Sequence, residues 1–149
     1  ARSSANTLLT LINEVLDFSK IESGKLELDI IDVDIVKLLE ETTESIAFQA
    51  HQKGLELILD TKDLTLHHVK TDPSKIRQIL TNLLGNAVKF TQNGEILITA
   101  SIEKNNNNLA LNCQVKDTGI GIPQDKISTL FDSFTQVDSS TTRKFGGTG

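Results

Sequence analysis

The sequence predicts an α+β protein, a two-layer α/β sandwich in which a mixed sheet is covered by helices on one face and preceded by a bundle helix. Segments with helical and with strand periodicity are interleaved along the chain, which is typical of helices packed on a sheet. A short Asn-rich turn joins the last two long strands, so that pair is expected to be an antiparallel hairpin. The first helix carries apolar residues over about half of its surface.

The first helix is expected over residues 3–23, with Gly24 ending it. Its apolar residues cover roughly half of the helical wheel, which is more than a helix resting on one surface can bury. We therefore expect it to bury this face in a dimer or against a neighbouring molecule. The apolar residues are Leu8, Leu9, Leu11, Ile12, Val15, Leu16 and Phe18.

Strands and a second helix are expected in the next part of the chain. Residues 26–30 alternate between apolar and polar, which predicts a strand. Asp34 can cap the N-terminus of a helix that Gly54 ends. Alternating leucines over 55–59 predict another strand, and a short one can follow over 67–71. The inward-facing residues of the second helix are expected to be Ile35, Leu38, Leu39, Ile46 and Ala50.

The strongest helix signal begins at Asp72-Pro73. Asp is a good N-cap residue and Pro fits the first helical position, so we expect a helix that runs to about Thr91. Asn93-Gly94 then makes a turn into an alternating strand, and residues 105–108 form the turn into the next strand. A helix from about Gln124 to Phe131 follows, and the Ser-, Thr- and Gly-rich remainder is expected to be a mobile loop.

Asp117 lies where the last strand gives way to a loop that contains glycine. Alternating apolar residues over 109–115 carry the strand up to this carboxylate. Gly119 and Gly121 have no Cβ, so the loop can bend sharply and let a flat ligand approach its backbone. The carboxylate can accept a hydrogen bond from an exocyclic amine, as on adenine. Ordinary turns show the same pattern, so the loop alone does not establish a ligand site.

A polar stripe runs along the helix that begins at Pro73. Asn82 and Asn86 are four residues apart and Lys89 is three further on, so their side chains lie along one line. An amide oxygen suits Mg²⁺, and Lys offers a compact positive charge to phosphate. A solvated face explains the stripe equally well. The apolar residues of the opposite face are Ile76, Ile79, Leu80, Leu83, Leu84, Ala87, Val88 and Phe90.

The composition excludes some classes of function. A net charge of −5 without a Lys/Arg cluster argues against nucleic-acid binding. No apolar run approaches the roughly 20 residues of a membrane span. The single Cys113 cannot form an internal disulfide and is expected to fill the core, which fits a reducing compartment. The chain begins without Met inside a helix and stops in a glycine-rich segment, so we expect a fragment of a longer protein.

Four segments together resemble the catalytic and ATP-binding domain of the two-component sensor histidine kinases. The helix from Asp72 to Thr91, with its core Asn-Leu-Leu-Gly-Asn-Ala-Val-Lys-Phe-Thr, is similar to the family's N-box. Residues 117–123 are similar to its first glycine box and residues 130–134 to its phenylalanine box. Residues 145–149 resemble the start of its second glycine box. The segments occur in the family's order and spacing.

The resemblance covers essentially the whole chain and divides it in two. Residues 1–24 resemble the second helix of the dimerisation and phosphoacceptor hairpin. Residues 25–149 resemble the catalytic domain, cut short within the second glycine box. Residues 134–138 and 142–145 are similar to the hybrid kinases, which carry a receiver domain downstream.

The resemblance implies the Bergerat-type fold shared with the gyrase, Hsp90 and MutL ATPases, with ATP and Mg²⁺ as cofactors. It implies that Asn86 ligates Mg²⁺, and that Asn82 and Lys89 are catalytic side chains facing the same cavity, with Lys89 meeting phosphate. Asp117 would accept a hydrogen bond from the adenine amine. Gly119, Gly121 and the neighbouring Ile122 would shape the base pocket.

Residues 132–149 would form a lid over the nucleotide. Phe131 and Phe134 either belong to the nucleotide site or anchor the lid by packing. The lid residues that would reach phosphate or let the backbone close over it are Arg143, Lys144, Gly147, Thr148 and Gly149.

The activity implied is phosphoryl transfer from ATP to a histidine and onward to the aspartate of a response-regulator receiver domain. The phosphoacceptor helix would come from the same or the partner subunit of a homodimer. His51, His67 and His68 do not stand in the family's phosphoacceptor motif, so this chain is not expected to phosphorylate itself. The domain would be cytoplasmic, in a parent protein that can be anchored in the inner membrane.

Two alternatives stay open. An ATP hydrolase of the gyrase or Hsp90 type would carry a Glu where Asn82 stands, and an amide cannot act as a general base near neutral pH. A non-catalytic nucleotide-binding or interaction module would keep the fold without phosphoryl transfer. The intact set of polar side chains on the helix and at Asp117 speaks against a decayed site.

Overall fold

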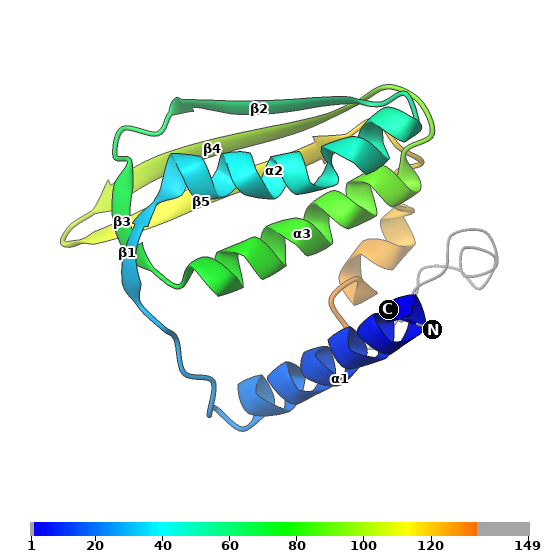
Figure 1. Ribbon diagram of the computed structural model, residues 1–149. Helices are drawn as coiled ribbons and strands as arrows, with labels where there is room; N and C mark the ends of the chain where they lie inside the picture. The colour runs from blue at the N-terminus through cyan, green and yellow to red at the C-terminus, as the bar shows by residue number, and fades with distance from the viewer. Residues whose placement is uncertain (1, 134–149) are drawn as a thin grey trace.

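Three strands form the main sheet of the computed structural model, which describes residues 2–133 (Figure 1). The central strand, β4 (Glu95–Asn105), is parallel to β2 (Glu56–Asp63) and antiparallel to β5 (Asn108–Asp117). A second, two-stranded sheet pairs β1 (Ile31–Asp34) with β3 (His68–Thr71) in antiparallel orientation. The main sheet is therefore mixed, as predicted.

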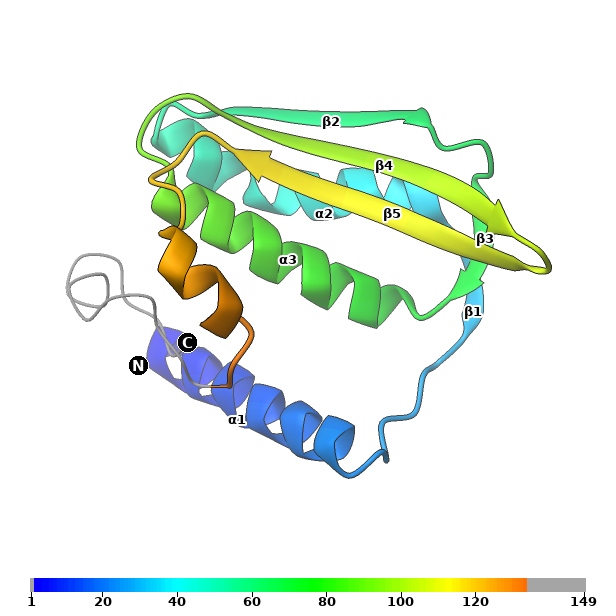
Figure 2. The same ribbon diagram turned by 180° about the vertical axis from the view of Figure 1, so that it is seen from behind.

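Two helices, α2 (Ile35–Gln52) and α3 (Pro73–Phe90), lie side by side on the same face of the main sheet (Figures 1 and 2). This arrangement confirms the predicted two-layer sandwich. The core lies between the helices and the sheet, and each fully buried Leu or Ile in it contributes about 1.5–3 kcal/mol to folding. Its buried residues include Leu38, Leu39, Ile46, Leu80, Leu84, Val88, Ile96 and Ile98.

Both helices of the sandwich begin at the predicted caps. The side chain of Asp34 accepts a hydrogen bond from the backbone N–H of Lys37 (3.1 Å) and starts α2. Asp72 does the same for α3 through the N–H of Lys75 (3.1 Å). The other carboxylate oxygen of Asp72 accepts the N–H of Asp29 (3.0 Å), so this one buried side chain also fastens the segment that follows α1.

The C-terminal end of α3 is held by a side chain from another part of the chain. Lys53, which follows α2, donates from Nζ to the carbonyl oxygens of Val88 (2.6 Å), Lys89 (3.2 Å) and Thr91 (3.2 Å). These carbonyls lie at the negative end of the helix dipole, where a cation is favourable. The contact fixes the end of α3 relative to α2.

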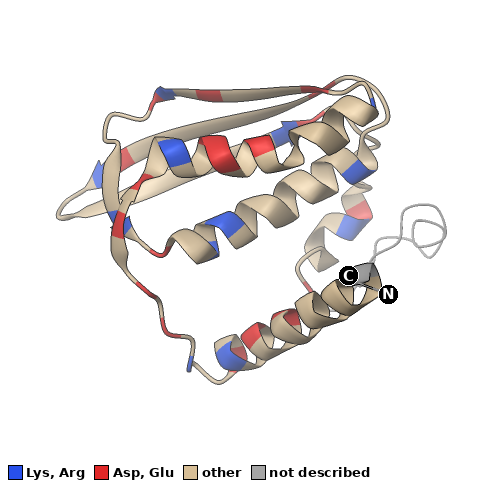
Figure 3. Ribbon diagram, viewed as in Figure 1, with Lys and Arg blue, Asp and Glu red and all other residues tan. Residues whose placement is uncertain are grey.

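The first helix, α1 (Arg2–Glu22), lies on the far side of α3 from the sheet in both views (Figures 1 and 2). Beyond its first turn, the charged residues of α1 lie toward its C-terminal end, as the ribbon colours of Figure 3 show. From that part of the helix, Asp17 pairs with Lys75 of α3 (3.0 Å). The large apolar side chains of α1 are mostly exposed, as the wide apolar face predicts; they include Leu8, Leu9, Ile12, Val15, Leu16 and Ile21.

Two predictions about local structure are wrong, and a third is met only in part. Residues 26–30 form no strand, because the alternating segment finds no neighbouring strand to pair with, and Leu28 and Ile30 are exposed. The expected helix from Gln124 to Phe131 is a 3₁₀ helix, η1 (Gln124–Thr129). On α3, Ile79 and Leu83 are exposed, because the helix packs on the core along a narrower face than its sequence suggests.

No helix within residues 2–133 combines the length and the hydropathy needed to cross a membrane.

We expect the stability of the fold to depend on the ionised state of Asp72. The N–H of Asp29, followed by those of Lys75 and Ser74, lowers the pKa of this carboxyl below its usual value. The folded pKa therefore lies below that of the unfolded chain, about 3.9. The carboxylate adds stability that is fully present above that pH and is lost as the pH falls through the folded pKa.

Urea unfolding of the native chain and of Asp72→Asn from pH 7 downward tests this expectation. Asp72→Asn should be less stable at pH 7, and the difference should shrink as the pH falls below about 4. A difference that stays constant with pH would show that the charge of Asp72 does not contribute.

Candidate functional site

The loop after β5 is joined to the C-terminal end of α3. The backbone N–H of Ile120 donates to the carbonyl oxygen of Phe90 (3.2 Å), the last residue of α3. The N–H of Thr118 donates to the carbonyl oxygen of Glu95 (3.3 Å), at the start of β4. Two segments that the sequence singled out separately, the glycine-containing loop and the polar helix, therefore meet at one place in the fold.

Asp117 presents an exposed carboxylate at this junction. Its Oδ1 accepts the backbone N–H of Gly119 (2.8 Å), which fixes the orientation of the side chain. A carboxylate has acceptor capacity for several hydrogen bonds, so the second oxygen stays available to an external donor. The position fits the predicted role toward an exocyclic amine.

Thr118 joins the start of this loop to the turn that precedes β4. Its Oγ1 accepts the backbone N–H of Glu95 (3.1 Å) and donates to the carbonyl oxygen of Asn93 (3.2 Å). Gly94 has a φ of 113° and lies so close to Thr118 that a Cβ would collide with Oγ1. The turn before β4 and the loop after β5 are thus built as one unit.

Gly119 has a packing role that the sequence did not predict. A Cβ on this residue would lie 2.5 Å from the carbonyl oxygen of Phe90 and 2.9 Å from Oγ1 of Thr91. The missing side chain therefore lets the loop pack against the end of α3. Gly121 has a φ of 70° with open space around it, so it supplies the bend of the loop.

The polar stripe of α3 lies on its outer side. Asn82 and Asn86 are exposed, and Lys89 is half-buried with Nζ 5.2 Å from the ring centroid of Phe90, a cation–π contact. Asn86 and Lys89 belong to the last turns of α3, which the Asp117 loop contacts. Asn82 lies one turn further from the loop.

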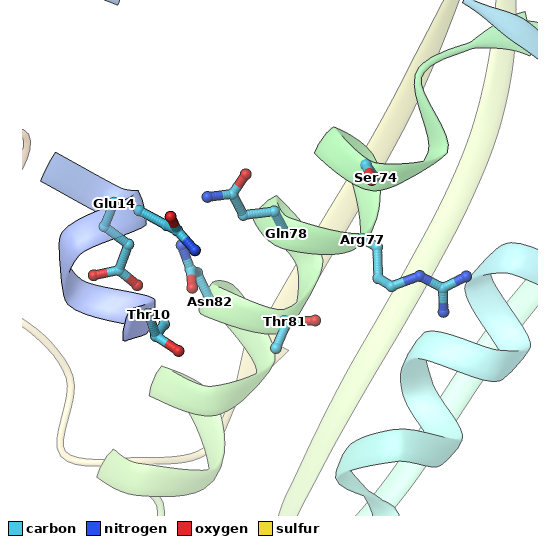
Figure 4. A pocket seen from close by; sticks show the side chains of 8 residues that line it. Thr10, Glu14, Ser74, Arg77, Gln78, Thr81 and Asn82 are labelled. Carbon is cyan, nitrogen blue, oxygen red and sulfur yellow. The ribbon is translucent and has the colours of Figure 1, made fainter. Parts of the chain in front are cut away.

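Asn82 also lines a pocket between α1 and α3 with a volume of about 360 Å³ (Figure 4). Beside this pocket, Asp17 of α1 accepts hydrogen bonds from Lys75 Nζ (3.0 Å) and Gln78 Nε2 (3.4 Å) of α3. These bonds connect the two helices. The bond from Lys75, followed by that from Gln78, lowers the pKa of the Asp17 carboxyl below its usual value. The pocket is lined by Thr10, Asn13, Glu14, Ser74, Arg77, Gln78, Thr81 and Asn82.

Ile122 is exposed in the loop beyond Gly121. Phe131 is 96% exposed, so the packing role considered for it is not seen in the described residues. Several expected residues lie outside the described residues; they are Phe134, Arg143, Lys144, Gly147, Thr148 and Gly149.

The structure also assigns local roles that sequence patterns missed. Lys53 and Thr118 look like ordinary surface residues in the sequence, and only their tertiary hydrogen bonds show what they hold together. Thr91 is fully buried, and its Oγ1 has no hydrogen-bond partner among the described residues. No sequence signal identifies an unpartnered hydroxyl, because that property depends on which segments surround it.

The donor groups at the junction fit a magnesium nucleotide. The described residues contain no group of three or more His, Cys, Asp and Glu that could hold a metal ion by itself. The amide of Asn86 is a single neutral oxygen donor, which suits a Mg²⁺ ion that takes its other ligands from phosphates and water. Lys89 on the same turns can neutralise phosphate charge, and Asp117 can accept an amine.

Substituting the two loop glycines should distinguish the close packing required at Gly119 from the positive φ required at Gly121. Gly119→Ala places a Cβ against the backbone of Phe90, which cannot move without disturbing α3, so we expect a loss of about 1–3 kcal/mol in the free energy of unfolding. In Gly121→Ala the new Cβ lies in open space, so we expect only the loss due to a positive φ, about 1 kcal/mol in the free energy of unfolding. Urea unfolding of both variants measures the difference. Equal losses in the free energy of unfolding for the two variants would show that the contact between Gly119 and Phe90 does not restrict which residue the loop can hold at position 119.

The chain was compared with known families and proteins. A family model described as histidine kinase-, DNA gyrase B-, and HSP90-like ATPase matches residues 71–149. The chain is 48% identical over 149 residues to the signal transduction histidine-protein kinase BarA of Escherichia coli K12, covering 98% of this chain and 16% of BarA. It is 43% identical over 150 residues to hybrid signal transduction histidine kinase L of Dictyostelium discoideum, covering 99% of this chain and 9% of that protein.

A solved structure of similar fold is that of full-length ShkA in complex with AMPPNP. It has a TM-score of 0.78 and 35% sequence identity, and the match covers 95% of this chain and 30% of that chain. The chain thus spans less than a third of each of these three proteins. Because the family model matches more than half of its residues, the chain belongs to the histidine kinase-, DNA gyrase B-, and HSP90-like ATPase family, and its domain is of the sensor histidine kinase type.

Proposed function

We propose that this chain binds ATP with Mg²⁺ and positions it for phosphoryl transfer to a histidine outside the chain, and onward to a response-regulator aspartate. The observation that carries the proposal is the junction at the end of α3. There, the hydrogen bond from Ile120 N–H to the Phe90 carbonyl brings the Asp117 loop against the turns that bear Asn86 and Lys89. An acceptor for a base amine and donors for a phosphate chain are thus held on one rigid unit.

Each side chain has a distinct role in this proposal. Asp117, oriented by the N–H of Gly119, accepts the exocyclic amine of adenine. Gly121 and Ile122 shape the base pocket, and Lys89 leaves its contact with Phe90 to meet phosphate. Asn82, which lines the pocket between α1 and α3, would face the nucleotide from one turn further along the helix.

Asn86 would hold Mg²⁺ through its amide oxygen. When bound, the ion would neutralise charge on the phosphates, and positioning together with charge compensation supplies most of the rate in phosphoryl transfer. The amide at Asn82 also separates this proposal from hydrolysis, because it cannot take a proton from water near neutral pH. The lid residues Arg143 and Lys144 would reach phosphate, with Gly147, Thr148 and Gly149 closing the backbone over it.

The whole protein is proposed from its relatives. BarA and the Dictyostelium protein are both named signal transduction histidine kinases, and the Dictyostelium protein is named a hybrid kinase, which supports a hybrid architecture. Residues 1–24, with the exposed apolar face of α1, would belong to the dimerisation hairpin of a homodimer, and residues 25–149 to the catalytic domain. We propose a cytoplasmic location for the domain, in a parent that can be anchored in the inner membrane.

Asp117→Asn should weaken nucleotide binding. The amide replaces one acceptor oxygen with a donor, and the loss of a hydrogen bond to a charged group corresponds to roughly a 10–100-fold weaker affinity. Calorimetric titration with AMPPNP and Mg²⁺ measures this change, with Asp125→Asn, an exposed acid of η1, as the matched control. If Asp117→Asn binds AMPPNP as tightly as the native chain, the Asp117 carboxylate does not accept a hydrogen bond from the adenine amine.

Asn86→Ala should remove the Mg²⁺-dependent part of AMPPNP affinity and leave the affinity without Mg²⁺ nearly unchanged. The matched control is Asn112→Ala, which deletes an exposed amide on β5 far from the junction. Paired titrations with Mg²⁺ and with a chelator measure the difference, and the same substitution in the parent protein should abolish phosphorylation by ATP. An unchanged Mg²⁺ dependence would remove Asn86 from the metal site.

A further inference from the structure

One buried hydroxyl beside the Asp117 loop has no hydrogen-bond partner among the described residues. Thr91 follows α3 directly, its side chain is fully buried, and its Oγ1 makes no hydrogen bond to any of the described residues. A buried polar atom without a partner destabilises the folded state, and valine would fill nearly the same volume without that cost. The hydroxyl therefore lowers the stability of the ligand-free structure. We look for its role in a ligand-bound state of the protein.

The surroundings of this hydroxyl point to Asp117. Gly119 faces three oxygens on the side where a Cβ would stand: the carbonyl oxygen of Phe90 at 2.5 Å, Oδ1 of Asp117 at 2.8 Å and Oγ1 of Thr91 at 2.9 Å from that position. The first two are acceptors, and each already takes one backbone N–H. The Thr91 hydroxyl supplies the one O–H donor among the three, and Asp117 is the only charged group.

We propose that Thr91 is a positioning residue for nucleotide recognition, whose hydroxyl donates to the Asp117 carboxylate when a base covers that carboxylate. In the described structure Asp117 is exposed, so water can satisfy it and the donor beneath it is not needed. A bound base excludes that water, which makes a charged hydrogen bond stronger and an unsatisfied carboxylate more costly. Thr91 thereby keeps the Asp117 carboxylate aimed at the exocyclic amine.

The inference rests on the proposed function, and its test uses the amine as the probe. AMPPNP with Mg²⁺ and purine riboside triphosphate, whose base lacks the exocyclic amine, are titrated against the native chain, Thr91→Val and Thr91→Ser. Thr91→Val should bind AMPPNP about tenfold more weakly. It should bind the amine-free nucleotide like the native chain, and its thermal midpoint should not fall. Thr91→Ser, which keeps the hydroxyl, should restore AMPPNP binding.

A double-mutant cycle adds a second readout. If Thr91 acts through Asp117, Thr91→Val should weaken binding little further in an Asp117→Asn background. Equal AMPPNP affinity of Thr91→Val and the native chain would overturn the inference and leave the proposed function standing. An equal loss for both nucleotides, or a lowered thermal midpoint, would show a packing role instead and also overturn it. Failure of the native chain to bind AMPPNP would remove the proposed function and this inference together.

Discussion

The close approach of Gly119 to the C-terminal end of α3 is the constraint on which the candidate site depends. Asp117 and the helix side chains are far apart in the sequence, and the Phe90 carbonyl, which accepts the N–H of Ile120, joins them. A side chain at Gly119 would occupy the same space as that carbonyl. The distance between the Asp117 carboxylate and the last turns of α3 is therefore set by backbone packing, which is stiffer than any side-chain contact.

Such a junction needs a helix that does not move, and α3 is fastened at both ends. Asp72 caps its first turn and at the same time holds the segment that leads from α1, while Lys53 binds three carbonyls at its last turn. One side of α3 is buried against the sheet through residues such as Leu84. The opposite side is left to the polar stripe, so core packing and the candidate site use different faces of one helix.

The sequence predicts those parts of the fold that depend on local physics. The caps at Asp34 and Asp72 act on backbone groups within three residues, and the alternation in β4 holds because one face of that strand is buried. The same alternation fails at residues 25–30, because periodicity does not show whether a partner strand exists. The positions of the candidate residues follow from the motifs, but the packing role of Gly119 and the buried hydroxyl of Thr91 come from tertiary contacts.

The region around the candidate site departs from what stability alone would select. Ile79 and Leu83 expose apolar surface on the outer face of α3, Gly121 requires a positive φ, and Thr91 buries a hydroxyl that makes no hydrogen bond within the described residues. A sequence selected only for stability could remove each of these features by a single substitution. Local rules are commonly broken where a protein binds a ligand, since the groups that contact it must stay incompletely satisfied beforehand. Exposed apolar side chains also occur elsewhere, as at Phe48, so the departure that singles out the junction is the buried hydroxyl of Thr91 beside the Asp117 loop, which fits the site proposed there.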